Sequence, residues 1–189
     1  MEYLRPFLIT ALTLALTGFA SLGGSTPLVS VEALNATLQN PTVRIEPTES
    51  FVDVSETFAI TVMIDEADEV GGFQFDMLFI TTTVTVDSVT LGDFLGSTGR
   101  TVGSVGPIID NQAGRVSFGA WSLPGAPGPN GTGALALVTL TAQDSGESPL
   151  DLQDVLVLDT HAEHETPTVE DGTVRAGFVV YLPLVLKER

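Results

Sequence analysis

Cysteine is absent from this sequence of 189 residues, and lysine occurs only once, at Lys187. Without cysteine the chain forms no disulfide, has no thiol nucleophile and offers no thiolate to zinc or to an iron–sulfur cluster. Basic residues are also scarce, at 7 against 24 acidic residues, which gives a formal net charge of −17. Because so acidic a surface repels the phosphates of nucleic acids and of anionic lipids, we expect no nucleic-acid partner.

The length and the composition fit one globular domain with short ends. Hydrophobic residues make up 43% of the chain and charged residues only 16%, which is typical of a folded protein rather than a disordered one. A body of roughly 130–150 residues can bury a core of its own without disulfides. The sequence contains no internal repeat, so we expect a single module rather than an array.

The sequence pattern predicts that both terminal segments lie outside the folded domain. Residues 7–22 form an apolar stretch behind Arg5, and small residues follow at 23–26. This pattern is typical of a secretory signal peptide, with a membrane anchor as the alternative. We expect residues 1–33 to hold the signal, with cleavage after Ala20 or Ala33, and residues 34–41 to form a polar lead-in. The apolar tail at 177–189 is too short to cross a bilayer, so we expect a secreted or cell-surface protein that is not membrane-inserted after signal removal.

Between these ends the residue pattern predicts an all-β fold. Short runs rich in β-branched and aromatic residues are separated by Gly, Pro, Asn or Asp, which is the pattern of a sandwich of two packed sheets. Residues 123–133 carry three prolines and four glycines, so we predict a surface loop there. The alternation within strands predicts a core that includes Phe58, Phe73, Phe75 and Phe118. We predict nine strands, at residues 42–46, 57–65, 70–79, 83–91, 101–109, 115–122, 134–142, 150–158 and 173–180.

A search for catalytic or metal-binding patterns gives little. His161 and His164 stand three residues apart, a spacing that brings two ligands to one face only in a helix, whereas this region lies between predicted strands. The acidic run at 65–69 could offer oxygens to calcium, but it departs from the spacing of a calcium-binding loop, so an exposed turn after a strand is favoured. We expect no enzymatic activity, no cofactor and no metal site on this chain.

The scarcity of exposed aromatic residues weighs against a broad sugar-binding platform. Such platforms stack sugar rings on Trp or Tyr side chains, and outside the signal segment the chain has only Trp121 and Tyr181. A carbohydrate-binding β-sandwich that uses a single-tryptophan cleft remains the alternative interpretation.

Several segments between residues 43 and 174 follow one another in a characteristic order. They are the apolar strand at 57–62, the glycine-led strand at 70–77, the run at 86–95, Gly114-Arg115-Val116-Ser117-Phe118, the glycine-containing segment at 131–136 and the closing Asp171-Gly172-Thr173-Val174. This ordered set resembles a bacterial cohesin domain, the module through which scaffold proteins capture dockerin-bearing partners. One departure is Phe79-Ile80-Thr81, which stands where many family members have Tyr-Asp-Pro.

The resemblance implies a nine-stranded jelly-roll β-sandwich over residues 42–176. It also implies a non-catalytic module that binds a dockerin-like protein through one sheet face, in an extracellular or cell-surface assembly that could act in polysaccharide degradation. Calcium is then expected on the dockerin partner. For Trp121 there is an alternative to a partner-binding role: its side chain could close the end of the core beside the proline-rich loop. The period of two along the third and sixth predicted strands gives the expected partner-binding residues as Gln74, Asp76, Leu78, Arg115, Ser117, Gly119 and Trp121.

Overall fold

The computed structural model describes residues 40–177 of the chain. The predicted signal segment, most of the lead-in and residues 178–189 of the tail lie outside the described residues. The elements are β1 (Thr42–Glu46), β2 (Glu49–Asp53), β3 (Thr57–Ala67), β4 (Val70–Leu78), β5 (Val84–Leu91), the 3-10 helix η2 (Phe94–Gly96), β6 (Val102–Asp110), β7 (Arg115–Ser122), β8 (Gly131–Ala142), β9 (Gly146–Asp159), β10 (His164–Glu165), β11 (Thr168–Glu170) and β12 (Gly172–Gly177).

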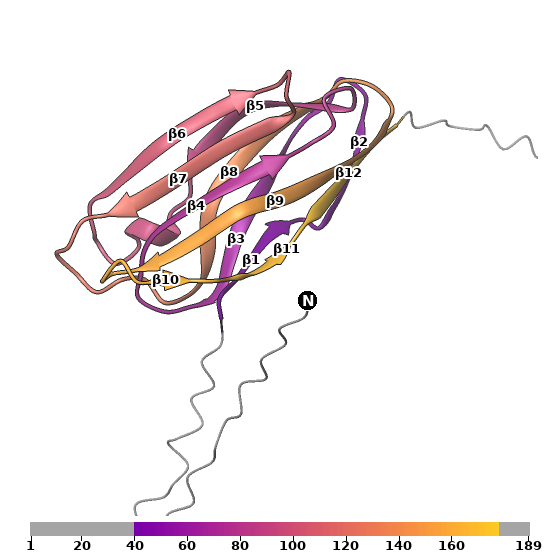
Figure 1. Ribbon diagram of the computed structural model, residues 1–189. Coiled ribbons are helices and arrows are strands. Elements are labelled where there is room, and N and C mark those ends of the chain that lie inside the picture. Colours follow the sequence, from indigo (N-terminus) through magenta and orange to yellow (C-terminus); the bar gives the residue numbers. More distant parts are fainter. Residues whose placement is uncertain (1–39, 178–189) are drawn as a thin grey trace, which may run out of the picture. The chain divides into compact units, whose positions relative to one another are not determined.

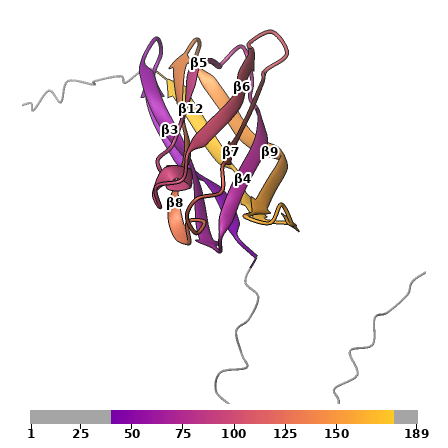
Figure 2. The ribbon, with the colours of Figure 1, turned by 90° about the vertical axis from the view of Figure 1, so that its left-hand side faces the viewer.

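These strands form two sheets packed face to face, so the predicted all-β sandwich is confirmed (Figure 1). One sheet has the order β11-β1-β3-β8-β5, and the other has the order β2-β12-β9-β4-β7-β6, with β10 added beside β9. Figure 2 shows the two layers from the side, with β3 and β8 in one and β4, β7 and β9 in the other. Within residues 40–177 no helix has the length and apolar character that a membrane span requires.

Each of the nine predicted strands corresponds to an observed strand, but the count of nine is not confirmed, because β2, β10 and β11 are additional. All three are short, and β2 begins with Glu49 and ends with Asp53. It pairs in parallel with β12, a strand more than a hundred residues away in the sequence. Local alternation carries no signal for such a pairing.

The core lies between the sheets and follows the predicted alternation. Phe73, Phe75 and Phe118 are buried and pack on one another, with ring centroids 6.1–6.3 Å apart. Such aromatic contacts add specific packing to the burial of large apolar surfaces. Phe58 differs from the prediction, because it is only half-buried and packs at the margin of the core.

Candidate partner-binding surface

The seven residues predicted to face a partner lie together on the outer side of the larger sheet. β4 and β7 are adjacent and antiparallel, and residues opposite each other in such a pair point to the same face. Their inward neighbours, Phe75 and Phe118 among them, are buried in the core. The outward pairs are Gln74 with Gly119, Asp76 with Ser117 and Leu78 with Arg115, while Trp121 lies opposite Gly72.

Two further strands widen this face, and sequence reasoning missed the residues that they contribute. β6 pairs with the outer edge of β7, and β9 pairs with β4 on its other side. The register places Val105 beside Gly119 and Leu156 beside Gln74, so one row of four outward residues crosses the sheet. Alternation could have found only part of these residues, because both strands contain an irregularity in register, and the place of β6 and β9 beside β7 and β4 depends on non-local pairing.

An irregularity in β6 gives that strand two exposed apolar side chains on the same face. Val105 pairs with Gly119 and Ile108 pairs with Ser117, so Gly106 and Pro107 stand opposite the single residue Phe118 and β6 has one extra residue. A strict period of two would send Val105 and Ile108 to opposite faces of the sheet. With the one extra residue, Val105 and Ile108 both point outward, and each is 65% exposed.

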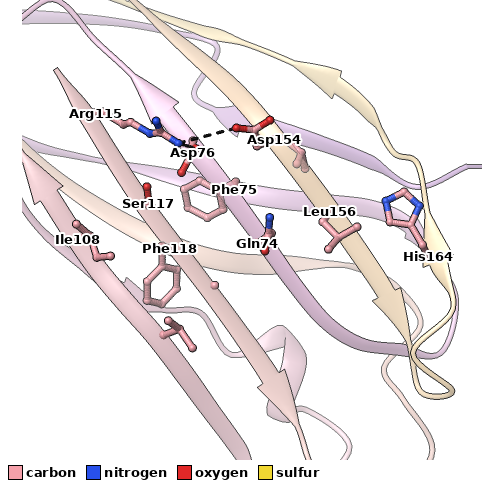
Figure 3. A pocket seen from close by; sticks show the side chains of 13 residues that line it. Gln74, Phe75, Asp76, Ile108, Arg115, Ser117, Phe118, Asp154, Leu156 and His164 are labelled. Carbon is pink, nitrogen blue, oxygen red and sulfur yellow. Dashed lines mark hydrogen bonds and ion pairs between the residues drawn. The ribbon is translucent and has the colours of Figure 1, made fainter. Parts of the chain in front are cut away.

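The outward residues of β6, β7, β4 and β9 line two adjoining hollows that form one groove. The first has a volume of about 590 Å³ and extends to Ile108, Arg115 and Asp154. The second, of about 430 Å³, extends toward Trp121 and Leu158. Both hollows are lined by Gln74, Val105, Gly119 and Leu156. Figure 3 shows the first hollow, with Ile108 on one side, Leu156 on the other and Gln74 between them.

One end of the groove is polar. Arg115 donates a hydrogen bond to Asp76 and lies 3.9 Å from the carboxylate of Asp154 (Figure 3). Asp76 points to the outer face as predicted, yet its side chain is largely buried in this ion pair. It therefore supports Arg115 rather than presenting itself to a partner. The Asp154 side chain is 76% exposed and is the open carboxylate at this end.

The position of Asp154 depends on a bulge in β9. Gln74 pairs with Leu156 and Asp76 pairs with Gln153, which leaves Asp154 and Val155 opposite the single residue Phe75. Asp154 has a φ of 49°, a left-handed conformation that Asp and Asn adopt more readily than most residues. The bulge turns the Asp154 carboxylate toward Arg115 on the outer face.

The other end of the groove is apolar and is built around Trp121. Trp121 is 46% exposed and has a glycine beside it on each neighbouring strand, Gly72 on β4 and Gly103 on β6. A Cβ atom added to Gly103 would lie only 2.5 Å from Cζ2 of the indole. The ring therefore lies across the backbone of β6, on the outer surface, rather than closing the end of the core.

The proline-rich segment forms the rim of this apolar end. Buried Arg100 donates from Nε to Ser122 Oγ at 2.8 Å and from Nη1 to the carbonyl of Ala126. The Ser122 hydroxyl in turn donates to the carbonyl of Gly71 at 3.1 Å. These bonds tie the loop to β4 and β7 and place Pro124 at the hollow. The loop is a surface loop as predicted, but β8 already begins at Gly131.

The acidic run at 65–69 is not a single turn, which corrects that part of the prediction. Asp65, Glu66 and Ala67 belong to β3. Asp65 accepts a hydrogen bond from Arg44 Nε at 2.6 Å, and this bond holds the pKa of the Asp65 carboxyl below its ordinary value. Within residues 40–177 no group of three or more His, Asp or Glu side chains is placed to hold a metal ion.

His161 lies between β9 and β10, as predicted, whereas His164 belongs to the short strand β10 rather than to a loop between strands. The carboxylate of Asp159 accepts hydrogen bonds from the backbone N–H groups of His161 and Glu163, each at 2.8 Å. The Glu163 bond in particular lowers the pKa of Asp159. His164 lines the polar hollow from β10, so it belongs to the groove and not to a ligand pair with His161.

Comparisons with known proteins find similar structures but no similar sequences. No family model and no curated protein sequence matches the chain. Among solved structures, a non-cellulosomal cohesin from the archaeon Archaeoglobus fulgidus is 17% identical, with a TM-score of 0.58 over 74% of this chain and 92% of that one. A type II cohesin domain from Acetivibrio cellulolyticus is 13% identical, with a TM-score of 0.58 over 71% of this chain and 95% of that one.

A third similar chain belongs to a type I cohesin–dockerin complex from Clostridium thermocellum. It is 11% identical, with a TM-score of 0.60 over 73% of this chain and 94% of that one. At identities this low the likeness is one of fold. The two-sheet architecture over residues 40–177 and the coverage of nearly the whole of each similar chain agree with the resemblance seen in the sequence. The chain has a cohesin-like fold.

Proposed function

We propose that this protein is a non-catalytic binding module that docks a dockerin-like protein on the outer face formed by β6, β7, β4 and β9. The observation that carries the proposal is the open groove on this face, walled by exposed Val105 and Ile108 on one side and by Leu156 on the other. Exposed apolar side chains that line a shared hollow mark interaction sites in proteins. Several solved structures with the same fold are complexes of a cohesin with a dockerin.

The ionisable groups of the groove support binding rather than catalysis. Asp76 is held by Arg115, and Arg115 also faces Asp154. A general acid or base works best when its pKa is tuned by a closed, water-excluding site, whereas this groove is an open surface. Aromatic and arginine side chains are enriched among the residues that dominate protein interfaces, and Trp121 and Arg115 occupy the two ends of the groove.

A carbohydrate ligand is the competing candidate, because Trp121 exposes an indole face. One ring can stack on a sugar. The other aromatic residues of this sheet region, Phe73, Phe75 and Phe118, are buried, so a flat platform of several rings is not available on this face. A glycan array separates the two candidates, since only a carbohydrate-binding module would retain an oligosaccharide.

We also propose that the protein is exported and acts at the cell surface or in an extracellular assembly. Once the signal is removed, the protein is not inserted in the membrane. The apolar segment at 7–22 and the small residues after it support export. Intact-mass measurement of protein from the culture medium should show the loss of 20–33 N-terminal residues, corresponding to cleavage after Ala20 or Ala33. A full-length product confined to the cytoplasm would reject export.

Titration calorimetry against the dockerin modules encoded in the same genome tests the main proposal. We expect affinity in the micromolar range or tighter for at least one module, and we expect a chelator to abolish it because the calcium belongs to the dockerin. Trp121→Ala should weaken binding by about tenfold or more, as for an aromatic interface anchor. Absence of binding to every module, together with retention of a glycan, would replace this function by the carbohydrate candidate.

A further inference from the structure

We propose that the step from Asn130 to Gly131 is a site of spontaneous covalent modification, at which the asparagine side chain loses ammonia and the backbone is partly rebuilt through that side chain. The step lies where the proline-rich loop joins β8. It does not depend on the proposed binding function, because it needs only this chain and water. The proposal is carried by the glycine that follows Asn130, by the exposure of both residues and by the hydrogen bond that holds the side-chain carbonyl.

The reaction begins with attack by the backbone nitrogen of Gly131 on Cγ of Asn130. The new N–Cγ bond closes a succinimide ring, the bond from Cγ to Nδ2 breaks, and the side-chain nitrogen leaves as ammonia with the proton that Gly131 loses. Water then adds to either carbonyl of the ring and opens it. One opening gives aspartate, and the other gives isoaspartate, in which the main chain runs through the side chain. The reaction is a substitution followed by hydrolysis, so it exchanges no electrons with another molecule.

Gly131 is the kind of residue that hinders this ring closure least. Glycine has no Cβ, and Gly131 has a φ of 89°, in the region that favours glycine. A Cβ added at this position would meet no atom within 4 Å outside its chain neighbours, so the surroundings leave room for the ring. Asparagine occurs at positions 35, 40, 111 and 130, and only Asn130 precedes a glycine.

The fold also prepares the side-chain carbonyl of Asn130 for attack. The backbone N–H of Glu69 donates a hydrogen bond to Asn130 Oδ1 at 2.5 Å. A donor in this place polarises the carbonyl and stabilises the negative charge that develops on its oxygen, as the donors of an oxyanion hole do. Asn130 and Gly131 are both exposed, so water reaches the ring and ammonia leaves without obstruction.

Asn111 has the same side chain in the opposite situation. Its amide accepts from the backbone N–H of Val86 and donates to the carbonyl of that residue, so the nitrogen is held as well as the oxygen. Gln112 follows Asn111, and the side chain of a following residue crowds the attacking backbone nitrogen. Asn111 is therefore the slow internal standard against which Asn130 is measured.

Isoaspartate at position 130 loosens the loop from the turn between β3 and β4. Two further bonds tie these segments, from the N–H of Val70 to the carbonyl of Pro129 and from the N–H of Gly128 to Glu69 Oε2, each at 3.1 Å. In isoaspartate the main chain is longer by one atom, and the oxygen that accepted from Glu69 becomes a main-chain carbonyl oxygen. Aspartate, in contrast, keeps the length of the main chain and an acceptor for Glu69.

Peptide mapping of the full-length protein during storage at mildly alkaline pH tests the proposal. The conversion replaces NH₂ by OH, which mass spectrometry detects, and an isoaspartate-specific methyltransferase labels the rearranged product. We expect Asn130 to convert at least tenfold faster than Asn111, with isoaspartate in the product. We expect the N–H of Val70 to exchange with solvent faster in aged than in fresh protein, since its bond to Pro129 is weakened.

Variants separate the chemistry from its consequences. Gly131→Ala has space for its methyl group and should slow the conversion, with circular dichroism as the check that it folds. Asn130→Gln should not convert at a comparable rate, because the longer side chain cannot close the same ring. Asn130→Asp carries the new charge on an unchanged main chain, so its Val70 N–H should exchange as slowly as in fresh wild type.

The pattern Asn130-Gly131-Thr132 is also an acceptor sequence for an N-linked sugar. Thr132→Ala removes that pattern and leaves the Asn130–Gly131 step, so the conversion should continue. A sugar on Asn130 of the exported protein would overturn the proposal, because it occupies the nitrogen that must leave. Equal conversion of Asn130 and Asn111, a product without isoaspartate, or conversion more than tenfold slower in the folded protein than in the urea-unfolded chain would also overturn it.

Discussion

The side-chain amide of Asn111 forms two hydrogen bonds with the backbone of Val86, accepting from its N–H and donating to its carbonyl, each at 2.9 Å. Asn111 lies in the turn between β6 and β7, whereas Val86 lies in β5, the edge strand of the other sheet. The amide reproduces what a neighbouring strand would offer to the backbone at this edge. One side chain thus joins the two layers beside the end of the candidate surface.

We predict that Asn111→Ala lowers the free energy of unfolding by about 1–2 kcal/mol, because two hydrogen bonds are lost and water can reach the freed groups only in part. Asn111→Asp should lose less, since it can still accept from Val86 N–H but cannot donate to the carbonyl. Urea unfolding measures both changes. Gln112→Ala, the adjacent exposed position, serves as control, and an equal loss there would contradict the role of the amide.

We predict that Phe75→Ala lowers the free energy of unfolding by about 3–5 kcal/mol, because Phe75 is buried within the cluster with Phe73 and Phe118. Phe51 is the matched control. It is 70% exposed, and the guanidinium of Arg175 lies 5.9 Å from the centre of its ring. Because little apolar surface is buried there, Phe51→Ala should cost no more than about 1 kcal/mol. Equilibrium denaturation of Phe75→Ala that matched the wild type would remove β4 from the core.

We predict that Gly103→Ala displaces the Trp121 indole with little loss of stability. The new Cβ would lie 2.5 Å from Cζ2, and the outer end of an exposed side chain can move away at small cost. Acrylamide should then quench the Trp121 fluorescence more strongly, and partner binding should weaken. Gly96→Ala is the control, because its Cβ would meet Val102 at an ordinary 3.6 Å. Unchanged quenching in Gly103→Ala would show that Gly103 does not position the indole.

We predict that the pair of Asp65 with Arg44 makes stability depend on pH in acid. The hydrogen bond from Arg44 lowers the pKa of Asp65 below its ordinary value of 3.8. A carboxyl with a lowered folded-state pKa stabilises the protein above its unfolded-state pKa, and this contribution disappears as the pH falls through the lowered value. Asp65→Asn should therefore cost about 1 kcal/mol at neutral pH and progressively less in acid below pH 3.8.

Unfolding curves for the wild type and Asp65→Asn across this acid range provide the measurement. Glu170→Gln, an exposed acid on β11 of the same sheet, controls for the loss of one negative charge. A difference between wild type and Asp65→Asn that stays constant down to the lowest pH would contradict the assignment.

Local pattern predicted much of the candidate surface. The alternation of β4 and β7 is a property of consecutive residues, since successive side chains of a strand point to opposite faces. It therefore placed Gln74 and Gly119 outward and Phe75 and Phe118 inward without knowledge of the partner strands, and the structure agrees. It misjudged Phe58, which lies at the margin of the core, because distance from the centre of a sheet is not a local property.

The sequence by itself determined three features: the all-β fold class, the alternation of inward and outward side chains along each strand, and the high negative charge. Each depends only on neighbouring residues or on composition. Tertiary structure decided which strands stand side by side, and hence that Val105, Ile108 and Leu156 wall the groove. It also decided that Arg115 covers Asp76 and that the β9 bulge exposes Asp154. Strand order, register and bulges arise from hydrogen bonds between distant segments, and no window of consecutive residues contains both partners of such a bond.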